Sequence, residues 1–311
     1  MAYEDLGNGD RATVMKYNSS SWEAVGGPGF SADNAVTTSL YVYNGVPYVA
    51  YVSGYSGGRA TVMKYAGSSW EAVGSPGFLS DYAYDTSLYV YNGTPYVAFW
   101  DTHTGSGHGS VMKLDGGIWV DIGTHGILEL TAYPSLKVYN GTPYVVCWAY
   151  GDLFSKATVK KYDGSNWVWV GSSPAFSSGS ADFMSLYVYN GTPYLACKDW
   201  SVDGKTTVKK YNGSNWVNVG SPGFSAGQAN YVSLSVDNGT PYVAYSDVAN
   251  GQKATVKKFN GTIWVNVGSP GFSAGQANYV SLYVYNGTPY VAYRDGANGN
   301  KATVMKFVAS P

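Results

Sequence analysis

The chain has 311 residues and a formal net charge of −1 at pH 7, with 16% aromatic and 13% charged residues. A nearly neutral chain without Lys/Arg runs argues against a nucleic-acid partner, and the lack of an 18-residue apolar stretch argues against membrane contact. The aromatic content predicts a well-filled globular core.

The N-terminal segment duplicates a segment near the other end of the chain. Residues 2–17, AYEDLGNGDRATVMKY, match residues 292–307, AYRDGANGNKATVMKF. Both contain an Ala-Thr-Val-Met-Lys strand, so residues 12–17 and 302–307 compete for one position in a closed ring of repeats. The sequence does not indicate which copy takes that position, or whether the chain comes from a longer or an engineered array.

From residue 39 onward the chain is a tandem repeat. A Ser-Leu pair followed by an aromatic-rich strand begins each of six copies, at Ser39, Ser87, Ser135, Ser185, Ser233 and Ser281. A full copy, such as residues 233–280, contains four short segments rich in Val, Tyr, Thr and Trp, which predict β-strands. An Asn-Gly pair follows the first strand and predicts a two-residue hairpin turn. A Trp-x-x-(Val/Ile)-Gly segment forms the fourth strand.

Four antiparallel strands in a repeat of this length predict a propeller blade, because one such sheet must stack on neighbours to bury both faces. We therefore expect an all-β, six-bladed β-propeller, a single domain of residues 1–311. Residues 1–38 are expected to complete the last blade, giving a composite blade from both termini. The alternative is an open β-solenoid, which usually has shorter coils and lacks two tight hairpins per repeat.

The duplicated third strand leaves one copy without a place in a six-bladed ring. It is expected to be displaced, frayed or paired with another molecule. An unpaired strand edge is a route to association. We therefore expect a monomer, or a dimer formed through the redundant terminal strand.

The repeat resembles the Kelch class of propeller blades. The resemblance rests on Tyr-Val-Ala-Tyr, a variable loop, and Lys-Tyr-Asn-Gly-Ser-Asn-Trp-Val, and it covers all six copies. Kelch blades carry a Gly-Gly pair where Ala244-Tyr245 stands here. Residues 163–167, Asp-Gly-Ser-Asn-Trp, also look like the Asp-box hairpin of sialidase-type propellers, with Asp and Gly adjacent rather than separated. The Gly-Ser-Pro-Gly-Phe-Ser-Ala-Gly segments resemble bacterial extracellular repeat proteins, which implies a secreted or cell-surface parent, although no signal peptide is recognised in the sequence.

The copies differ most in the long connections between strands two and three and between successive blades, which share one face. Invariant parts serve the fold and divergent parts are free for local function, so this face is the predicted binding face. Aromatic rings beside carboxylates suit a sugar ring. The candidate ligand-binding residues are Trp100, Asp101, Trp148, Tyr150, Asp199, Trp200, Asp247 and Asp295.

Each group of candidates also has a structural interpretation. The aromatic residues could fill gaps between blades, and the repeated Asp residues, which include Asp5, could cap loop backbone. We expect no metal and no cofactor. The alternative is a zinc or nickel site formed by the three histidines, His103, His108 and His125, which fall in loops of one face but lack a metal-ligand spacing on a helix or strand.

The sequence favours a non-catalytic binding or scaffold module, lectin-like if it has a small ligand, with carbohydrate or a protein surface as partner. The alternative is a purely structural spacer or adhesion segment of a larger extracellular protein. A third hypothesis is a glycoside hydrolase with paired carboxylates at the channel mouth.

Overall fold

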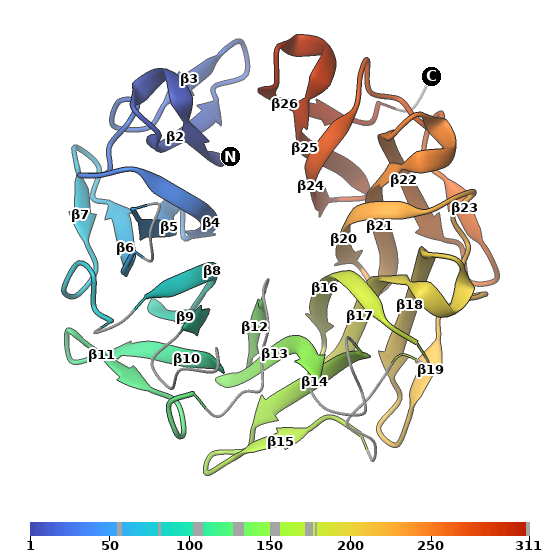
Figure 1. The fold of residues 1–311 in the computed structure, drawn as a ribbon, viewed down its shortest axis with the longest axis horizontal. Helices are drawn as coiled ribbons and strands as arrows, with labels where there is room; N and C mark the ends of the chain where they lie inside the picture. Colours follow the sequence, from blue (N-terminus) through green and yellow to red (C-terminus); the bar gives the residue numbers. More distant parts are fainter. Residues whose placement is uncertain are drawn as a thin grey trace. The chain divides into compact units, whose positions relative to one another are not determined.

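A computed structural model describes residues 1–54, 58–79, 82–101, 108–126, 134–149, 156–171, 177 and 179–308; the side chains of residues 108 and 147–149 are not described. These parts of the chain contain 26 β-strands (Figure 1). They also contain four short 3-10 helices: Leu6–Asn8, Trp200–Val202, Val248–Asn250 and Gly296–Asn298. None of the described helices is long and apolar enough to cross a membrane.

The strands form seven antiparallel sheets in the described chain, each built from consecutive strands. Two sheets have three strands: β1 (Ala2–Asp5), β2 (Arg11–Tyr17) and β3 (Trp22–Ala24); and β24 (Ala277–Tyr285), β25 (Thr288–Asp295) and β26 (Lys301–Lys306). The four-stranded sheets are β4 (Ala35–Tyr43), β5 (Val46–Ser53), β6 (Ala60–Tyr65) and β7 (Trp70–Ala72); β8 (Ala83–Tyr91), β9 (Thr94–Asp101), β10 (His108–Asp115) and β11 (Ile118–Asp121); β12 (Ser135–Tyr139), β13 (Thr142–Ala149), β14 (Lys156–Tyr162) and β15 (Trp167–Trp169); β16 (Ala181–Tyr189), β17 (Thr192–Asp199), β18 (Lys205–Tyr211) and β19 (Trp216–Asn218); and β20 (Ala229–Asp237), β21 (Thr240–Asp247), β22 (Lys253–Phe259) and β23 (Trp264–Asn266).

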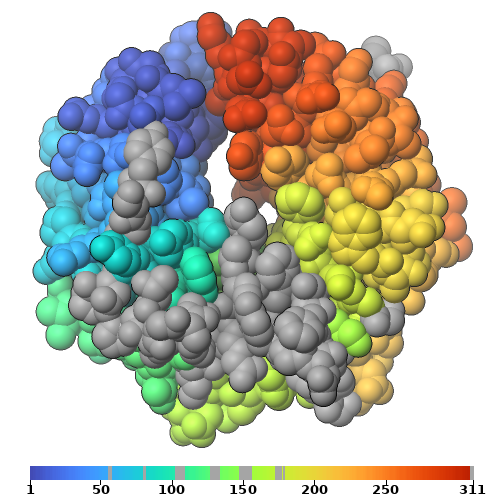
Figure 2. Space-filling model, viewed as in Figure 1, coloured from blue at the N-terminus to red at the C-terminus, as the bar shows by residue number. Residues whose placement is uncertain are grey.

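The chain divides into two compact units, residues 1–147 with 161–168 and residues 148–160 with 169–311. The first unit contains the sheets β1–β3, β4–β7 and β8–β11. The second contains the sheets β16–β19, β20–β23 and β24–β26. In the second unit these three sheets adjoin in sequence order, from yellow-green through orange to red in Figure 2.

The architecture is a β-propeller of four-stranded antiparallel blades, as predicted, but it has seven blades, not six. The predicted composite blade is wrong. The N-terminal strands β1–β3 pair among themselves, as do the C-terminal strands β24–β26. Each duplicated third strand pairs with the strand just before it, β2 with β1 and β26 with β25. Pairing close neighbours in sequence closes only a short loop, which costs less entropy than joining the two ends of the chain.

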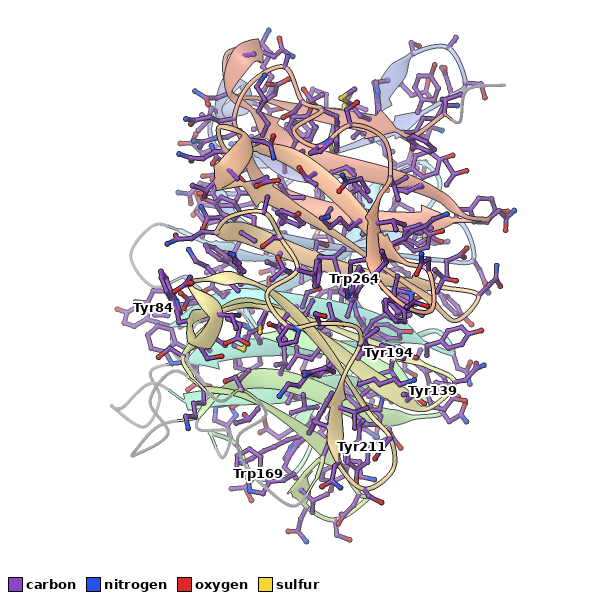
Figure 3. All side chains as sticks on the ribbon, turned by 90° about the vertical axis from the view of Figure 1, so that its right-hand side faces the viewer. Tyr84, Tyr139, Trp169, Tyr194, Tyr211 and Trp264 are labelled. Carbon is purple, nitrogen blue, oxygen red and sulfur yellow. The ribbon has the colours of Figure 1, made fainter. Side chains whose placement is uncertain are left out.

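The Asn-Gly turns set the register of the first two strands of a blade. Asn238 and Gly239 have φ angles of 47° and 78°, the left-handed values that a type I′ turn requires. Asp237 consequently pairs with Thr240, and Leu234 with Val243. In the first unit, Tyr84 lies at one end of the strands and Tyr139, next to such a turn, at the other (Figure 3).

Neighbouring sheets are joined by the tryptophan of each fourth strand. Trp264 is buried (Figure 3), and its indole N–H donates to the backbone oxygen of Val219 in the preceding sheet at 2.7 Å. The Phe224 ring stacks on it, with centroids 4.3 Å apart. The core of the second unit therefore lies between successive sheets, where Tyr245 and Val243 are fully buried.

Candidate functional site

An irregularity near the start of the first strand recurs in five sheets. The register with the second strand shifts between Asn230 and Ser233 in β20, and Tyr231 within this bulge has a φ of 53°. The equivalent residues in other sheets also have positive φ: Thr37, Asp85, Phe183 and Tyr279. Bulky residues rarely adopt this left-handed conformation, and such strain is concentrated at functional sites. The bulge therefore singles out a position where the backbone is constant and the side chain varies.

In the second unit this position carries three aromatic rings, Phe183, Tyr231 and Tyr279, which we call the aromatic row. The ring centroids of Phe183 and Tyr231 are 5.0 Å apart, and those of Tyr231 and Tyr279 are 5.1 Å apart. Tyr279 is 65% exposed, so the row reaches solvent at this end. Tilted rings at this spacing support one another and offer apolar surface to a ligand.

A polar cluster borders the Phe183 end of the row. The Trp200 indole donates to Asp182 Oδ2 at 2.6 Å, and Lys198 Nζ donates to Asn230 Oδ1 at 2.9 Å. Lys198 Nζ also lies 4.5 Å from the centre of the Trp200 ring, a cation–π distance. The Trp200 ring is 44% exposed, so this cluster presents an indole, a carboxylate and an amide on one accessible surface.

Gly204 makes room for this cluster. A Cβ at Gly204 would lie 2.9 Å from Lys198 Cε and 3.3 Å from Trp200 Cζ3. Gly204 also has a φ of +70°, a value that favours glycine. The turn after the Trp200–Val202 helix is therefore shaped to let the lysine pass beneath the indole.

The electrostatics of the site follow from burial. Lys198 is only 6% exposed, and desolvation lowers the pKa of its ammonium group, whereas the charge of Asp182 opposes that shift. Burial likewise raises the pKa of the Tyr231 phenol, with Tyr279 adding to the shift and Arg294 opposing it. The Arg294 guanidinium lies 5.5 Å from the Tyr279 ring centre, so a cation borders each end of the row.

The predicted aspartates at the end of strand two are buried and hydrogen-bonded within their own sheets. Asp247 accepts from the backbone N–H of Ala249 at 3.2 Å and from Thr255 Oγ1 at 3.0 Å; the Thr255 oxygen accepts from the Gly271 N–H at 2.8 Å. Asp295 and Asp199 accept from backbone N–H groups two residues later at 3.0 Å. The carboxylates thus cap the following turn and tie it to the loop after strand four.

Asp101 has a different environment in the first unit. Its Oδ2 accepts from Ser110 Oγ at 3.1 Å and lies 3.3 Å from His125 Nε2. His125 Nδ1 lies 2.8 Å from Asp121 Oδ1, so the imidazole bridges two carboxylates. Trp100 packs on Tyr84 with centroids 4.7 Å apart, and its indole nitrogen is buried with no hydrogen-bond partner in the described chain.

Other candidates lie outside the described residues. Tyr150 and His103 are not described, and Trp148 and His108 are described only as parts of strands β13 and β10. Within the described side chains, no group of three His, Cys, Asp or Glu residues could hold a metal ion. Of the predicted site residues, the structure places Trp200 beside the aromatic row.

The sequence interpretation missed the row and most of its polar border: Asp182, Phe183, Lys198, Asn230, Tyr231, Tyr279 and Arg294. A signal was present in the sequence, because the residue two positions before each of the six Ser-Leu pairs varies while its surroundings repeat: Thr37, Asp85, Tyr133, Phe183, Tyr231 and Tyr279. It was missed because variation was sought in the long loops rather than at the start of the first strand.

Comparisons with known proteins identify a fold. No protein-family model matches the chain, and no curated protein matches it in sequence. The structure of YjhT is similar with a TM-score of 0.55 and 12% identity, covering 87% of this chain and 93% of that one. A protein of unknown function from Dyadobacter fermentans has a TM-score of 0.58 and 12% identity, with 88% and 93% covered. Trypanosoma rangeli sialidase in complex with sialic acid has a TM-score of 0.56 and 11% identity; the match covers 98% of this chain but only 58% of the sialidase.

These neighbours correct the functional prediction. The sialidase is a glycoside hydrolase, and its similarity contradicts the prediction of a non-catalytic lectin-like module or structural spacer. At this identity the likeness shows the propeller fold alone. Without a matching family, the finer resemblance to Kelch repeats is not supported either.

Proposed function

We propose that this protein is a carbohydrate-active enzyme of the glycoside hydrolase class, with its sugar-contacting surface on the aromatic row and the adjoining polar cluster. The observation that carries the proposal is the Asp182 carboxylate held at 2.6 Å by the indole of an exposed tryptophan, Trp200. A sugar ring needs an apolar face to stack on and polar groups for its hydroxyls. Both are present within one unit.

Asp182 is the proposed acid–base group. The Trp200 indole bonds to Oδ2 and so orients the carboxylate, leaving Oδ1 to face a glycosidic oxygen. Lys198 beneath the Trp200 ring supplies nearby positive charge. Glycoside hydrolysis also needs a nucleophile or base, and a phenol serves as the nucleophile in some hydrolases. In the row, Tyr231 is the phenol proposed for that role, and Tyr279, 5.1 Å from it between ring centroids, supplies stacking surface.

The test is hydrolysis of fluorogenic glycosides of neutral, amino and acidic sugars in both anomeric configurations. We expect the wild-type chain to cleave at least one of them, and Asp182→Asn to lower kcat/KM about 100-fold or more, the usual contribution of a general acid or base. Tyr279→Ala should mainly raise KM, because it removes stacking surface. The matched control is Asp203→Asn, because Asp203 is exposed nearby with a φ of 60° that asparagine also tolerates.

A wild-type chain that cleaves none of these glycosides would contradict the proposal. So would a cleaving chain whose rate is the same in Asp182→Asn and Asp203→Asn, because activity would then lie elsewhere. Circular dichroism of each variant shows that the fold is intact.

A further inference from the structure

A cavity of about 460 Å³ lies in the second unit, where the sheets β16–β19 and β20–β23 adjoin. One wall comes from strands β17 and β18 of the first sheet. The other comes from the Asn-Gly turn after β20 and from the end of β22. Cavities of this size hold small-molecule ligands in many proteins. The cavity is therefore large enough to be a binding site.

This cavity is distant from the aromatic row. Tyr231 of the row lies near the start of β20, whereas Gly239, which lines the cavity, follows the end of the same strand. A strand rises about 3.3 Å per residue, so roughly 20 Å of strand separates the two places. A small ligand in the cavity would not touch the polar cluster, and the proposed sugar site does not account for the cavity.

The wall from the first sheet carries a cation and a phenol side by side. Tyr194 of β17 pairs directly with Lys210 of β18, so the two side chains leave the sheet on the same face. Tyr194 packs in one core with Trp264 of the second sheet, and both residues are labelled in Figure 3. This face is therefore turned toward β20–β23. Lys210 is exposed and forms no ion pair within the described chain, so its ammonium group is free to meet a ligand.

The Tyr194 hydroxyl is a second free donor. Tyr194 is only 8% exposed, yet its hydroxyl forms no hydrogen bond with any described residue. Tyr211, on the same sheet, instead donates its hydroxyl to Gly213 O at 2.9 Å. Burial raises the pKa of the Tyr194 phenol, and Tyr189 adds to this shift, so the hydroxyl keeps its proton at neutral pH. An acceptor supplied by a ligand would satisfy this largely buried donor.

The wall from the second sheet is apolar and held in place. It includes Pro241 and Phe259. The Phe259 ring lies 5.7 Å from the Trp264 ring, whose indole donates to Val219 O at 2.7 Å. Lys258 also lines the cavity, and no Asp or Glu is among the described residues around it. Two lysines without a lining carboxylate make the local potential positive, which favours an anion.

We propose that this cavity binds a small organic anion, a carboxylate or phosphate group carried on an apolar ring. The anionic group accepts hydrogen bonds from the Lys210 ammonium group and the Tyr194 hydroxyl, and the ring lies against Phe259 and Pro241. Hydrogen bonds to an ionised acceptor are roughly twice as strong as those between neutral groups, so an anion is preferred over a neutral ligand of the same shape. This site is separate from the proposed sugar site and does not depend on it.

The probes are benzoate and phenyl phosphate, with benzyl alcohol as the neutral match, each titrated into the full chain and followed by ligand-observed NMR. We expect saturable binding of at least one anion, and the tighter of the two identifies the preferred group. Lys210→Met should weaken it at least about 10-fold, and Tyr194→Phe by about 5-fold or more, the usual effects of losing a charged and a neutral hydrogen bond. The control is Lys205→Met, which removes the same charge from the other end of β18 and should change affinity less than about 2-fold.

Saturable anion binding that is weakened in Lys210→Met and Tyr194→Phe but kept in Lys205→Met supports the proposal. The proposal would be overturned if neither anion bound, if benzyl alcohol bound as tightly as the anions, or if Lys210→Met and Lys205→Met had equal affinity. Circular dichroism confirms that each variant is folded. Glycoside hydrolysis is measured separately, so failure of the proposed function and failure of this site are distinguishable.

Discussion

One repeat position, at the end of the second strand, shows how the hydroxyl group of a buried tyrosine affects the free energy of unfolding. It carries Tyr51, Phe99, Tyr245 and Tyr293 in the sheets where its side chain is aromatic and described. The hydroxyl of Tyr293 donates to Met305 Sδ at 3.1 Å, whereas the hydroxyl of Tyr245 is fully buried with no partner in the described chain. Phe99 fills the same slot without a hydroxyl. A buried hydroxyl without a partner carries an uncompensated desolvation cost.

Tyr245→Phe should therefore raise the free energy of unfolding by about 1 kcal/mol at pH 7. Burial, reinforced by Asp247, raises the pKa of Tyr245, so the native state keeps its proton above pH 10 while the unfolded chain loses it. Alkaline pH then destabilises the wild-type chain, and the advantage of Tyr245→Phe should grow as pH rises above 10. Urea unfolding at pH 7 and pH 10.5 measures both effects.

The control for this prediction is Tyr51→Phe. Tyr51 hydrogen-bonds to Thr61, so this variant should have a lower free energy of unfolding than the wild-type chain at pH 7. A change of the same sign in Tyr245→Phe and Tyr51→Phe would contradict the argument.

At the scale of the element, the strands were predictable and the bulge was not. Asn-Gly turns and Trp-x-x-Val-Gly segments identify four strands per blade because each motif has one local backbone solution. The number of blades depended on whether β2 and β26 belong to one sheet or to two. Their sequences are nearly identical, so the local sequence pattern could not decide between these arrangements. The aromatic row escaped prediction because a tyrosine at positive φ contradicts its own propensity, and only the surrounding sheet imposes it.

The strain at the bulge is directly testable. If the φ of 53° at Tyr231 is strained, the free energy of unfolding of Tyr231→Gly should be about 1 kcal/mol higher than that of Tyr231→Ala. In an ordinary strand position the order is reversed, because glycine is the less stabilising residue. Denaturant midpoints of the two variants provide the measurement. The comparison is Val243→Gly against Val243→Ala, at a fully buried position in the partner strand, where the alanine variant should be the more stable of the two. If alanine were also better at position 231, the left-handed conformation would not be a constraint.

At the scale of the whole molecule, the tryptophan of each fourth strand bonds only to the sheet that precedes it in sequence. A change at one such tryptophan is therefore expected to destabilise the neighbouring sheets and not distant ones, as in repeat proteins. The Trp119 indole joins β8–β11 to β4–β7 by donating to Val73 O at 2.9 Å. The Trp264 indole joins β20–β23 to β16–β19 by donating to Val219 O at 2.7 Å. A Trp→Ala change in a packed core costs about 3–5 kcal/mol. Trp119→Ala should therefore raise amide hydrogen exchange about 100-fold or more in β4–β11 and leave β20–β23 nearly unchanged. Trp264→Ala should produce the opposite pattern.

The control is Trp22→Ala, because Trp22 is 41% exposed and its loss should change exchange little. Amide exchange of all three variants is measured by mass spectrometry. A uniform loss of protection in both units would contradict the prediction, because it would mean that the blades unfold as one cooperative body.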